Sequence, residues 1–365
     1  MAWYSGRNWT REQIVSYVGD PLQIAGARGS VLADGKGEGV RAIEVVTGSG
    51  FVFTVLPGRG MDIPFASYKG KSLGFFSGTG ITAPGYYDEP GLEWRRTFYA
   101  GLLTTCGITN AGAPSVDGGR AFGLHGRISN AAAENLSVDQ DWEGDEFVIS
   151  LKGMMREAEA MVENMALTRR ILTRLGAKGF RVQDVVINRG FEPQPLMLLY
   201  HFNYGFPLLS PNAYVVGPIR ETVARDEEAR KDRGVAECLA FPEPILGFQE
   251  KVFFHELAQD RNGRTFVALL NRDAGDGAPL GVIARWKRDE LPHLCQWKMP
   301  RKGFYVMGLE PCNVLPLGRG VLRGQGKLPM LAGQASYTVS IDFEVLDSAA
   351  ELDAVEKEAK TLSKS

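Results

Sequence analysis

A histidine and a carboxylate each interrupt an apolar stretch of this 365-residue chain. His201 and Asn203 lie within Leu199–Gly205, and Glu310 lies within Val306–Asn313. Because alternate residues of a strand point to the same face, we expect His201 and Asn203 to point together. Burying an unpaired carboxylate is costly, so the position of Glu310 needs a reason. A proton donor that works near neutral pH and a carboxylate base together indicate acid/base chemistry on a small polar ligand.

Each of these residues also has a structural interpretation. His201 could be a buried histidine that bonds to backbone groups, and Glu310 could form a buried ion pair with Lys298 or Arg319. Gln296 and Lys298 alternate along another apolar segment, so they share one face of the strand that this segment predicts. That face could contribute polar groups to the same pocket, which makes Lys298 a candidate substrate-binding residue.

A segment rich in glycine directly follows a predicted strand and carries an arginine and a carboxylate. Arg59 lies between Gly58 and Gly60, and Asp62 comes three residues after Arg59. Glycine allows a tight bend and a close approach of the backbone to a ligand. Arg59 could therefore clamp a ligand hydroxyl or carboxylate, and the structural alternative is an Arg59–Asp62 salt bridge across a turn.

A second segment of this kind is Gly123–Asn130, which contains His125 and Arg127. These two residues share a face if the segment is extended, and the flanking glycines favour a loop at the end of a strand. The density of polar groups indicates a binding role, whereas a lone histidine is more often structural. Trp94 lies beside Arg95 and could stack on a sugar, although tryptophan is also a common core residue.

The composition argues against several classes of protein. The net charge is −2, with 41 basic and 43 acidic residues, which lacks the basic footprint of a nucleic-acid-binding protein. No apolar run resembles a secretory signal or a membrane span. The four cysteines form no CxxC pair, so we expect a reduced cytoplasmic protein. The chain has no HxH, HExxH, GxGxxG or P-loop pattern, so we expect neither a metal nor a cofactor.

The chain must position these residues mainly on strands, because 44 glycines and 19 prolines separate many short apolar runs. Capping boxes predict a short helix from Thr10 to about Val18 and a helix from Ser348 to Leu362. Ser77–Glu93 has no clear period and predicts a long surface loop. The pattern predicts strands at Gly39–Val46, Gly50–Leu56, Phe147–Leu151, Met165–Thr173, Gly179–Asn188, Leu196–Phe202, Lys251–Glu256, Thr265–Asn271, Gly281–Trp286, His293–Lys298, Gly303–Gly308 and Ala335–Val345.

The domain organisation follows from the absence of a polar linker between these strands. We expect an N-terminal helical extension at 1–22, one β-sandwich domain at 23–347 and a C-terminal helix and tail at 348–365. The C-terminal helix could pack on its own sheet or on a second copy of the chain. The sequence therefore leaves the choice between a monomer and a homodimer open.

Four segments, in this order along the chain, resemble the aldose 1-epimerase (galactose mutarotase) superfamily. They are Arg59–Asp62, Leu124–Asn130, Tyr200–Gly205 and Gly308–Asn313. The resemblance is closer to a bacterial branch of aldose-epimerase-like proteins, and it extends over about residues 25 to 347. It implies an all-β fold, a large twisted antiparallel β-sandwich with a carbohydrate cleft on one concave face.

The resemblance also implies catalytic roles. His201 matches the family's general acid, which protonates the ring oxygen of a sugar. Glu310 matches the general base, which removes the proton of the anomeric hydroxyl. The ring opens, the carbonyl carbon rotates about its bond to C2, and the ring closes as the other anomer, without a cofactor. This chemistry implies an ionised Glu310 and a protonated His201 in the productive state.

The expected partner is a small-molecule carbohydrate, with no nucleic acid and no membrane. Within the resemblance, His125 and Arg127 match a region that holds sugar hydroxyls and the ring oxygen, and Arg59 and Asp62 match a sugar-contacting segment loosely. The candidate substrate-binding residues are Arg59, Asp62, His125, Arg127, Asn203, Lys298 and Asn313.

The chain departs from the familiar mutarotase pattern in two respects. The acid of that pattern sits in Asn-His-x-x-x-Asn, whereas Tyr200 precedes His201 here. The cations Arg59, Arg127 and Lys298 exceed what a neutral hexose needs. We therefore consider a preference for an acidic or otherwise modified sugar.

Three functions remain open at this point. The first is an aldose 1-epimerase that interconverts the anomers of a free sugar. The second is a sugar isomerase or lyase on the same scaffold, in which the His201 and Glu310 pair moves a carbon-bound proton. The third is a non-catalytic carbohydrate-binding protein, for which Glu310→Gln would leave function intact. The sequence does not name the sugar.

Overall fold

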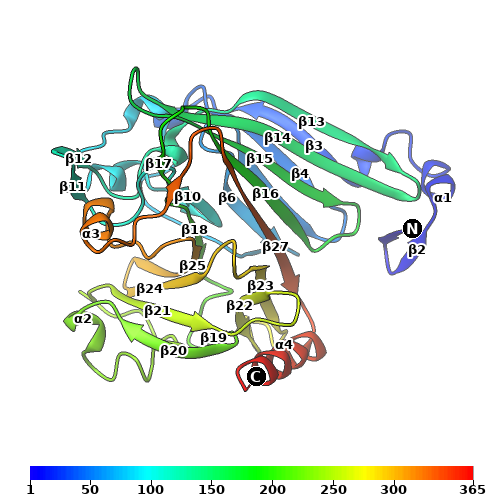
Figure 1. Ribbon diagram of the computed structural model, residues 1–365. Coiled ribbons are helices and arrows are strands. Elements are labelled where there is room, and N and C mark those ends of the chain that lie inside the picture. The colour runs from blue at the N-terminus through cyan, green and yellow to red at the C-terminus, as the bar shows by residue number, and fades with distance from the viewer. Residues whose placement is uncertain (365) are drawn as a thin grey trace.

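Two large antiparallel sheets lie face to face in the computed structural model of this chain, which describes residues 1–364 (Figure 1). One sheet has eleven strands and the other has eight. This arrangement confirms the expected antiparallel β-sandwich. Ser365, the last residue of the expected C-terminal segment, lies outside the described residues.

The eleven-stranded sheet carries the strand of His201 near its middle. Its strands in spatial order are β20 (Ile219–Ala224), β21 (Lys251–Leu257), β24 (His293–Arg301), β25 (Phe304–Cys312), β18 (Leu199–Tyr204), β10 (Leu103–Cys106), β6 (Asp62–Tyr68), β5 (Phe51–Leu56), β4 (Arg41–Val46) and β3 (Gly26–Val31), with β7 (Lys71–Ser72) paired to β6.

The eight-stranded sheet contains the longest strands. In spatial order it comprises β13 (Glu134–Glu143), β14 (Glu146–Ala158), β15 (Asn164–Arg174), β16 (Gly179–Asn188), β27 (Ser336–Leu346), β23 (Leu280–Lys287), β22 (Arg264–Asn271) and β19 (Ala213–Val216). Small two-stranded sheets join β1 (Ala2–Tyr4) to β2 (Arg7–Trp9), β8 (Phe75–Phe76) to β9 (Ala100–Gly101), β11 (Ser115–Asp117) to β12 (Arg120–Phe122) and β17 (Gln194–Pro195) to β26 (Met330–Leu331).

The helices are short and lie at the ends of the chain or in connections. The α-helices are α1 (Arg11–Val15), α2 (Glu227–Arg230), α3 (Arg319–Gly324) and α4 (Ala349–Leu362). The 3₁₀ turns are η1 (Pro21–Gln23), η2 (Gly35–Gly37), η3 (Pro84–Tyr86), η4 (Glu93–Thr97) and η5 (Ile128–Asn130). No helix among residues 1–364 is both long and apolar enough to cross a membrane.

Aromatic side chains fill the space between the two sheets. Phe51 and Phe53 of the larger sheet pack against Phe180 of the smaller one at ring-centroid distances of 6.2 and 5.1 Å. Phe202 of β18 stacks on Phe343 of β27 at 5.9 Å. Because side chains alternate along a strand, Phe202 enters this core while His201 and Asn203 point to the opposite, outer face of the sheet.

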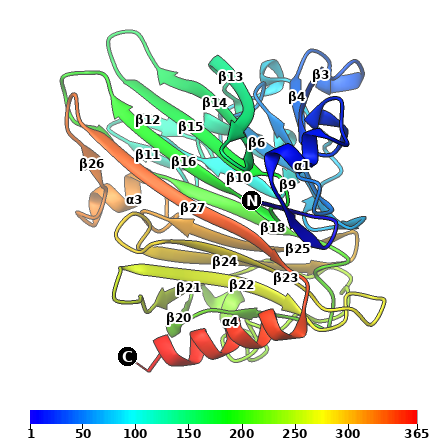
Figure 2. The ribbon, with the colours of Figure 1, turned by 90° about the vertical axis from the view of Figure 1, so that its right-hand side faces the viewer.

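Both predicted capping boxes form, at Thr10 and at Ser348. The first helix is shorter than expected and ends at Val15, and the hairpin of β1 and β2 precedes it. The apolar face of α4 packs against β22 and β23 of its own eight-stranded sheet, as Figure 2 shows. Among the described residues, this contact covers the helix face that could have met a second copy.

The strand that carries Glu310 is longer than predicted. We expected it to end at Gly308, but β25 continues to Cys312, so Glu310 lies inside the sheet. It continues because β25 has hydrogen-bonded neighbours on both sides, with Cys295 of β24 directly opposite Glu310. A proline often marks the end of a strand, but the pairing with strands on both sides keeps β25 extended through Pro311.

Candidate active site

The structure brings His201 and Glu310 together on the outer face of the eleven-stranded sheet. The register of β18 with β25 pairs Leu199 with Cys312 and Phe202 with Leu309, so His201 and Glu310 face each other between these pairs. Nε2 of His201 lies 3.3 Å from Oε1 of Glu310. The two residues are only 4% and 2% exposed, so their interaction takes place away from bulk water.

Burial controls the protonation of this pair. Desolvation raises the pKa of the Glu310 carboxyl to about 8, because a carboxylate loses more hydration than a neutral acid. Desolvation also holds the pKa of His201 well below its ordinary value of 6.5, and nearby His125 lowers it further. At pH 7 these directions favour a neutral glutamic acid beside a neutral imidazole. This is the reverse of the charge distribution that the resemblance implies for the productive state.

Several buried polar atoms around the pair have no hydrogen-bond partner among the described residues. They are Nδ1 of His201, Oδ1 of Asn203, Nδ1 of His125 and Oε1 of Glu310, for which the 3.3 Å approach to Nε2 of His201 is an ion-pair contact and not a hydrogen bond. Asn203 uses its other side-chain atom, since Nδ2 donates to the backbone oxygen of His201 at 2.8 Å. The ring of His125 lies 5.7 Å from that of His201. Buried polar atoms are normally paired, so this group of atoms indicates a place where a polar ligand binds.

Aromatic rings enclose these atoms. Trp94 lies 4.7 Å from the ring of His125, and Phe98 lies 5.4 Å from the ring of His201. Trp297 approaches His201 at 5.5 Å. Phe98 and Trp297 were not predicted as residues of the site. Trp297 lies two residues from Cys295, on the face of β24 that is next to Glu310. Apolar walls with a few convergent polar atoms are typical of small-molecule sites.

Gly308 has no side chain to fill the space beside His201 and Glu310. It lies directly opposite Trp297 in β24 and opposite Asn203 in β18. A β-carbon at this position would come within 2.5 Å of Oε1 of Glu310 and 3.2 Å of Cε1 of His201. A glycine here therefore provides the space in which the two side chains meet.

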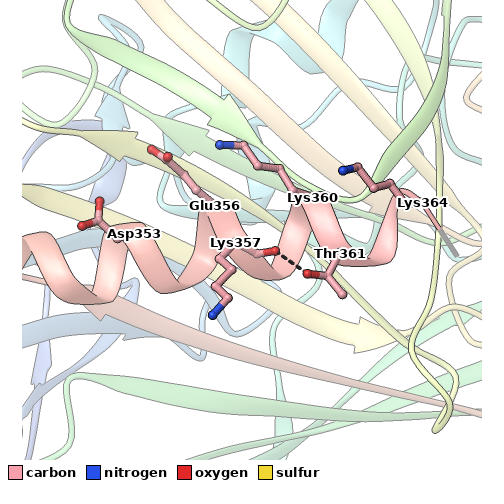
Figure 3. Close-up of a pocket in the computed structure, with 6 residues that line it drawn as sticks. All are labelled: Asp353, Glu356, Lys357, Lys360, Thr361 and Lys364. Atoms are coloured by element: carbon pink, nitrogen blue, oxygen red, sulfur yellow. Dashed lines mark hydrogen bonds between the residues drawn. The ribbon is translucent and has the colours of Figure 1, made fainter.

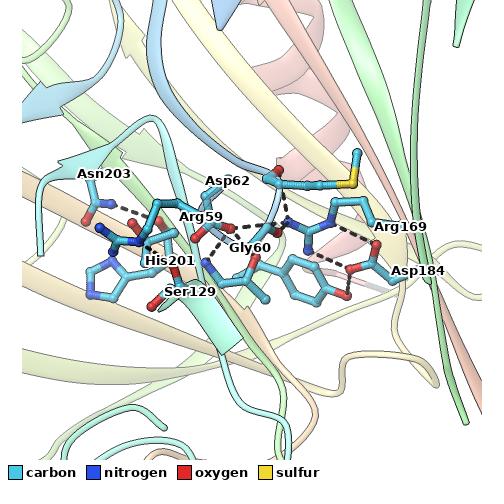
Figure 4. A network of polar contacts seen from close by, with 12 residues as sticks. Arg59, Gly60, Asp62, Ser129, Arg169, Asp184, His201 and Asn203 are labelled. Atoms are coloured by element: carbon cyan, nitrogen blue, oxygen red, sulfur yellow. Dashed lines mark hydrogen bonds and ion pairs between the residues drawn. The ribbon is translucent and has the colours of Figure 1, made fainter. Parts of the chain in front are cut away.

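Arg59 does not present a free guanidinium to the site. It is 1% exposed and donates hydrogen bonds to the backbone oxygens of Thr82, Thr97 and Ser129. Figure 4 shows Arg59 together with Ser129. Within residues 1–364 the side chain of Arg59 forms no hydrogen bond or ion pair with that of Asp62, and the two residues are joined only through the backbone, where the amide of Asp62 donates to the oxygen of Arg59 at 3.0 Å. The side-chain contacts of Arg59 tie the loop that contains Thr82 to the segment around η5, so Arg59 holds the walls of the site in place.

Asp62 belongs to a separate polar network on the inner side of the sheet. Its Oδ1 accepts from the amide and hydroxyl of Thr105 and lies 3.3 Å from the guanidinium of Arg169. Arg169 also pairs with Asp184, whose Oδ2 accepts from the hydroxyl of Tyr200 at 2.8 Å. In Figure 4, Arg169 and Asp184 lie on the far side of Asp62 from His201. The structure therefore does not bring Asp62 to the His201 and Glu310 pair.

Two other predicted cations are also bound to protein groups. Arg127 forms an ion pair with Glu89 from the loop before η4. Lys298 points to the opposite face of β24 from Trp297, and its ammonium donates to the backbone oxygens of Glu237 and Ala240, each at 2.7 Å. The strand alternation was predicted, but the structure turns the face of Lys298 away from Glu310.

Asn313 fixes the backbone beside the site. Its Oδ1 accepts from the amide of Leu198 at 2.7 Å, and its Nδ2 donates to the oxygen of Leu196 at 2.9 Å. The proposed ion pair between Glu310 and Arg319 does not form, because Arg319 pairs with Asp117 instead.

Other features of the surface do not involve the pair. A hollow on α4 is lined by charged residues and a threonine, namely Asp353, Glu356, Lys357, Lys360, Thr361 and Lys364 (Figure 3). Within the part of the chain that the structure describes, no three His, Cys, Asp or Glu side chains are grouped so as to hold a metal ion.

Comparison with known proteins agrees with this architecture. Residues 37–345 match the model of a family described as a domain of unknown function, DUF4432. No functionally curated protein matches the chain. A crystal structure from Klebsiella pneumoniae, provisionally described as an aldose 1-epimerase, superposes with a TM-score of 0.87 at 24% identity, covering 94% of this chain and 90% of that one.

More distant structures share the fold. A galactose mutarotase-like protein from Clostridium acetobutylicum matches with a TM-score of 0.61 at 15% identity, covering 89% of this chain and 99% of that one. The galactose 1-epimerase from Lactobacillus acidophilus matches with a TM-score of 0.55 at 10% identity and the same coverages. The chain therefore has the galactose mutarotase-like fold.

Proposed function

The chain belongs to the DUF4432 family, and we propose that it is an aldose 1-epimerase-like isomerase that interconverts the anomers of a free sugar. The observation that carries this proposal is the contact between His201 and Glu310, with unpaired polar atoms on both side chains, inside an aromatic enclosure. The likeness of the fold to proteins with aldose 1-epimerase and galactose mutarotase descriptions supports it.

The geometry suits two oxygens on one carbon. The ring oxygen and the anomeric oxygen of a sugar are both bonded to C1, so they lie side by side. Nε2 of His201 and Oε1 of Glu310 also lie side by side, at 3.3 Å. The imidazole gives a proton to the ring oxygen as the C1–O bond of the ring breaks. The carboxylate takes the proton of the anomeric hydroxyl as the carbonyl forms.

The reaction needs one proton on the pair as a whole. In the neutral pair that proton is on Glu310, whose pKa is about 8. Transfer of this proton to His201 gives an imidazolium and a carboxylate with the same total number of protons. The hydroxyls of a bound sugar would stabilise both charges by hydrogen bonding. The site can therefore hold the proton on the carboxyl and still supply the charge-separated form that the reaction uses.

The substrate that fits these contacts is a neutral sugar. We considered an acidic sugar because of Arg59, Arg127 and Lys298, but each of these cations is bound to groups of the protein. Arg95 of η4 is an exposed cation whose charge acts on His125. An acidic sugar would have to use Arg95, so Arg95→Gln tests that preference separately.

The experiment that tests the proposal is two-dimensional exchange NMR in deuterated buffer. The panel contains D-glucose, D-galactose, D-xylose, D-ribose, D-glucuronic acid and D-galacturonic acid. We expect wild type to accelerate α/β exchange of at least one neutral sugar without deuterium incorporation. Glu310→Gln, which keeps the shape but cannot take the proton, should lose about 10²- to 10⁴-fold in rate.

Other outcomes would redirect the assignment. Deuterium at C2 would identify an isomerase or lyase that uses the same pair on a carbon-bound proton. Binding of a sugar with no exchange in either variant would identify a carbohydrate-binding protein.

A further inference from the structure

Trp297 differs from the other rings of the site in its exposure and its neighbours. Trp94 is 2% exposed and lies between the stacked ring of Phe98, at 4.5 Å, and the ring of His125. Trp297 is half-buried and meets Phe98, His201 and Phe304 at steep interplanar angles of 53°, 84° and 66°. Among the described residues, no ring lies parallel on its indole face. Trp297 can therefore offer that face to a ligand.

The position of Trp297 places it beside the reacting groups. It lies opposite Gly308, and a β-carbon on Gly308 would stand 3.1 Å from Cβ of Trp297 and 2.5 Å from Oε1 of Glu310. The absence of a side chain at Gly308 leaves the indole next to the carboxyl. A sugar whose anomeric carbon lies next to Glu310 therefore places one of its C–H faces against the indole ring of Trp297.

A carboxylate fixes the orientation of the indole. Nε1 of Trp297 donates to Oε2 of Glu250 at 2.9 Å. The other oxygen of Glu250 accepts from the guanidinium of Arg225 at 3.3 Å. The backbone amide of Arg225 in turn donates to the oxygen of Val252, the residue opposite Trp297 in β21. Glu250, Arg225 and the pairing of β21 with β24 therefore all help to fix the orientation of the Trp297 ring.

We propose that Trp297 is the stacking wall of the sugar site and that Glu250, held by Arg225, is a positioning residue that fixes this wall for binding. This inference rests on the proposed function for its kinetic tests and not for its binding test. Side chains that are locked before binding lose less rotational freedom when the ligand arrives. Glu250 therefore contributes to sugar affinity without touching the sugar.

The first test separates binding from chemistry. With the panel sugar that wild type turns over fastest, Trp297→Phe and Glu250→Leu should each raise KM about tenfold and change kcat less than about threefold. Glu250→Gln keeps an oxygen that can accept the indole N–H, so it should restore a KM close to wild type. Glu256→Gln is the matched control, since Glu256 lies on β21, the strand that directly follows Glu250, and forms a surface ion pair with Arg288.

The second test asks whether Glu250 acts through Trp297. If it does, the double variant Trp297→Phe/Glu250→Leu should have the KM of Trp297→Phe alone. Independent effects would instead multiply, to about a hundredfold. Multiplied effects, or a wild-type KM in Glu250→Leu, would overturn the positioning role.

The third test does not require turnover. Tryptophan fluorescence is recorded in the Glu310→Gln background while D-galactose, D-xylose or D-glucose is added. We expect a saturable change that disappears when Trp297→Phe is added to Glu310→Gln. The same change in both proteins would overturn the stacking role. Should wild type accelerate no anomer exchange, the proposed function would fail while this binding result would still decide the role of Trp297.

Discussion

The two faces of β18 hold two buried polar clusters that differ in how fully they are bonded. On the inner face, Tyr200 donates to Asp184, and Asp184 pairs with Arg169 at 2.6 Å. On the outer face, one residue further along the chain, His201 meets Glu310, and polar atoms of both lack partners in the described part of the chain. Burial is nearly complete on both faces, so burial alone does not distinguish them.

The two clusters differ in whether a buried cation compensates the charge of the buried carboxylates. The inner carboxylates face the fully buried guanidinium of Arg169, which donates to Asp184 and lies within 3.3 Å of Asp62. One oxygen of Asp62 lacks a partner, and burial raises the pKa of that carboxyl to about 7. Within residues 1–364, no arginine or lysine forms an ion pair with Glu310 of the outer cluster, and burial favours its neutral form. A bonded cluster stabilises the sandwich, whereas an uncompensated one is a place for a ligand.

The largest expected effect comes from breaking the inner cluster. Arg169→Met leaves Asp62 and Asp184 buried without their cation, so the free energy of unfolding should fall by about 3–5 kcal/mol. Urea unfolding followed by fluorescence measures this loss. Glu310→Gln is the matched comparison and should not destabilise the protein, because it replaces an uncompensated acid. A cost below about 1 kcal/mol for Arg169→Met would remove the contrast between the faces.

The next effect concerns the space inside the outer cluster. Gly308→Ala places a β-carbon against Oε1 of Glu310, which must move away from His201. A displacement of this size should lower kcat/KM by about a hundredfold while the chain remains folded. Gly29→Ala on β3 is the control, since a β-carbon there meets nothing within 4 Å. Unchanged exchange in Gly308→Ala would show that the close contact of the pair is not needed.

The pH dependence of exchange sharpens the comparison further. The active pair carries one proton, which is lost as the pH rises through the pKa of Glu310, about 8. The pKa of His201 lies well below 6.5, so the second proton binds only in acid. We therefore expect kcat/KM to be flat near pH 7 and to fall by about tenfold per pH unit above pH 8. Spontaneous exchange without protein must be subtracted at each pH. A fall centred near pH 6.5 would instead indicate an ordinary, solvated histidine.

Apolar strand patterns predicted many of the strands and, within the site, the shared face of His201 and Asn203. β16 has the predicted bounds of Gly179–Asn188, because its alternation reflects one buried face. β13 was not predicted, because it is an edge strand with largely exposed side chains and therefore lacks a clear apolar period. The shared face of His201 and Asn203 followed from their spacing alone.

The remaining contacts depend on which strands become neighbours. Alternation along β24 separates Lys298 from Trp297 but does not say which of them faces Glu310; the register with β25 decides that. The partners of Arg59 are backbone oxygens of distant loops, and backbone groups carry no signal in the sequence. Glu250 and Trp297 are likewise 47 residues apart. Sequence patterns predict which residues share a face of a strand, whereas the pairing of strands across the sheet decides which side chains touch.

The smallest effect tests two consecutive residues on opposite faces. Tyr200→Phe removes the hydroxyl that donates to Asp184, so it should cost about 1–2 kcal/mol of unfolding free energy. Exchange should stay within about twofold of wild type, because the ring still fills the core and His201 keeps its position. His201→Gln should do the opposite and lose activity with little change in stability. If Tyr200→Phe lowered exchange tenfold at unchanged stability, the two faces of β18 would have to be treated as one coupled site.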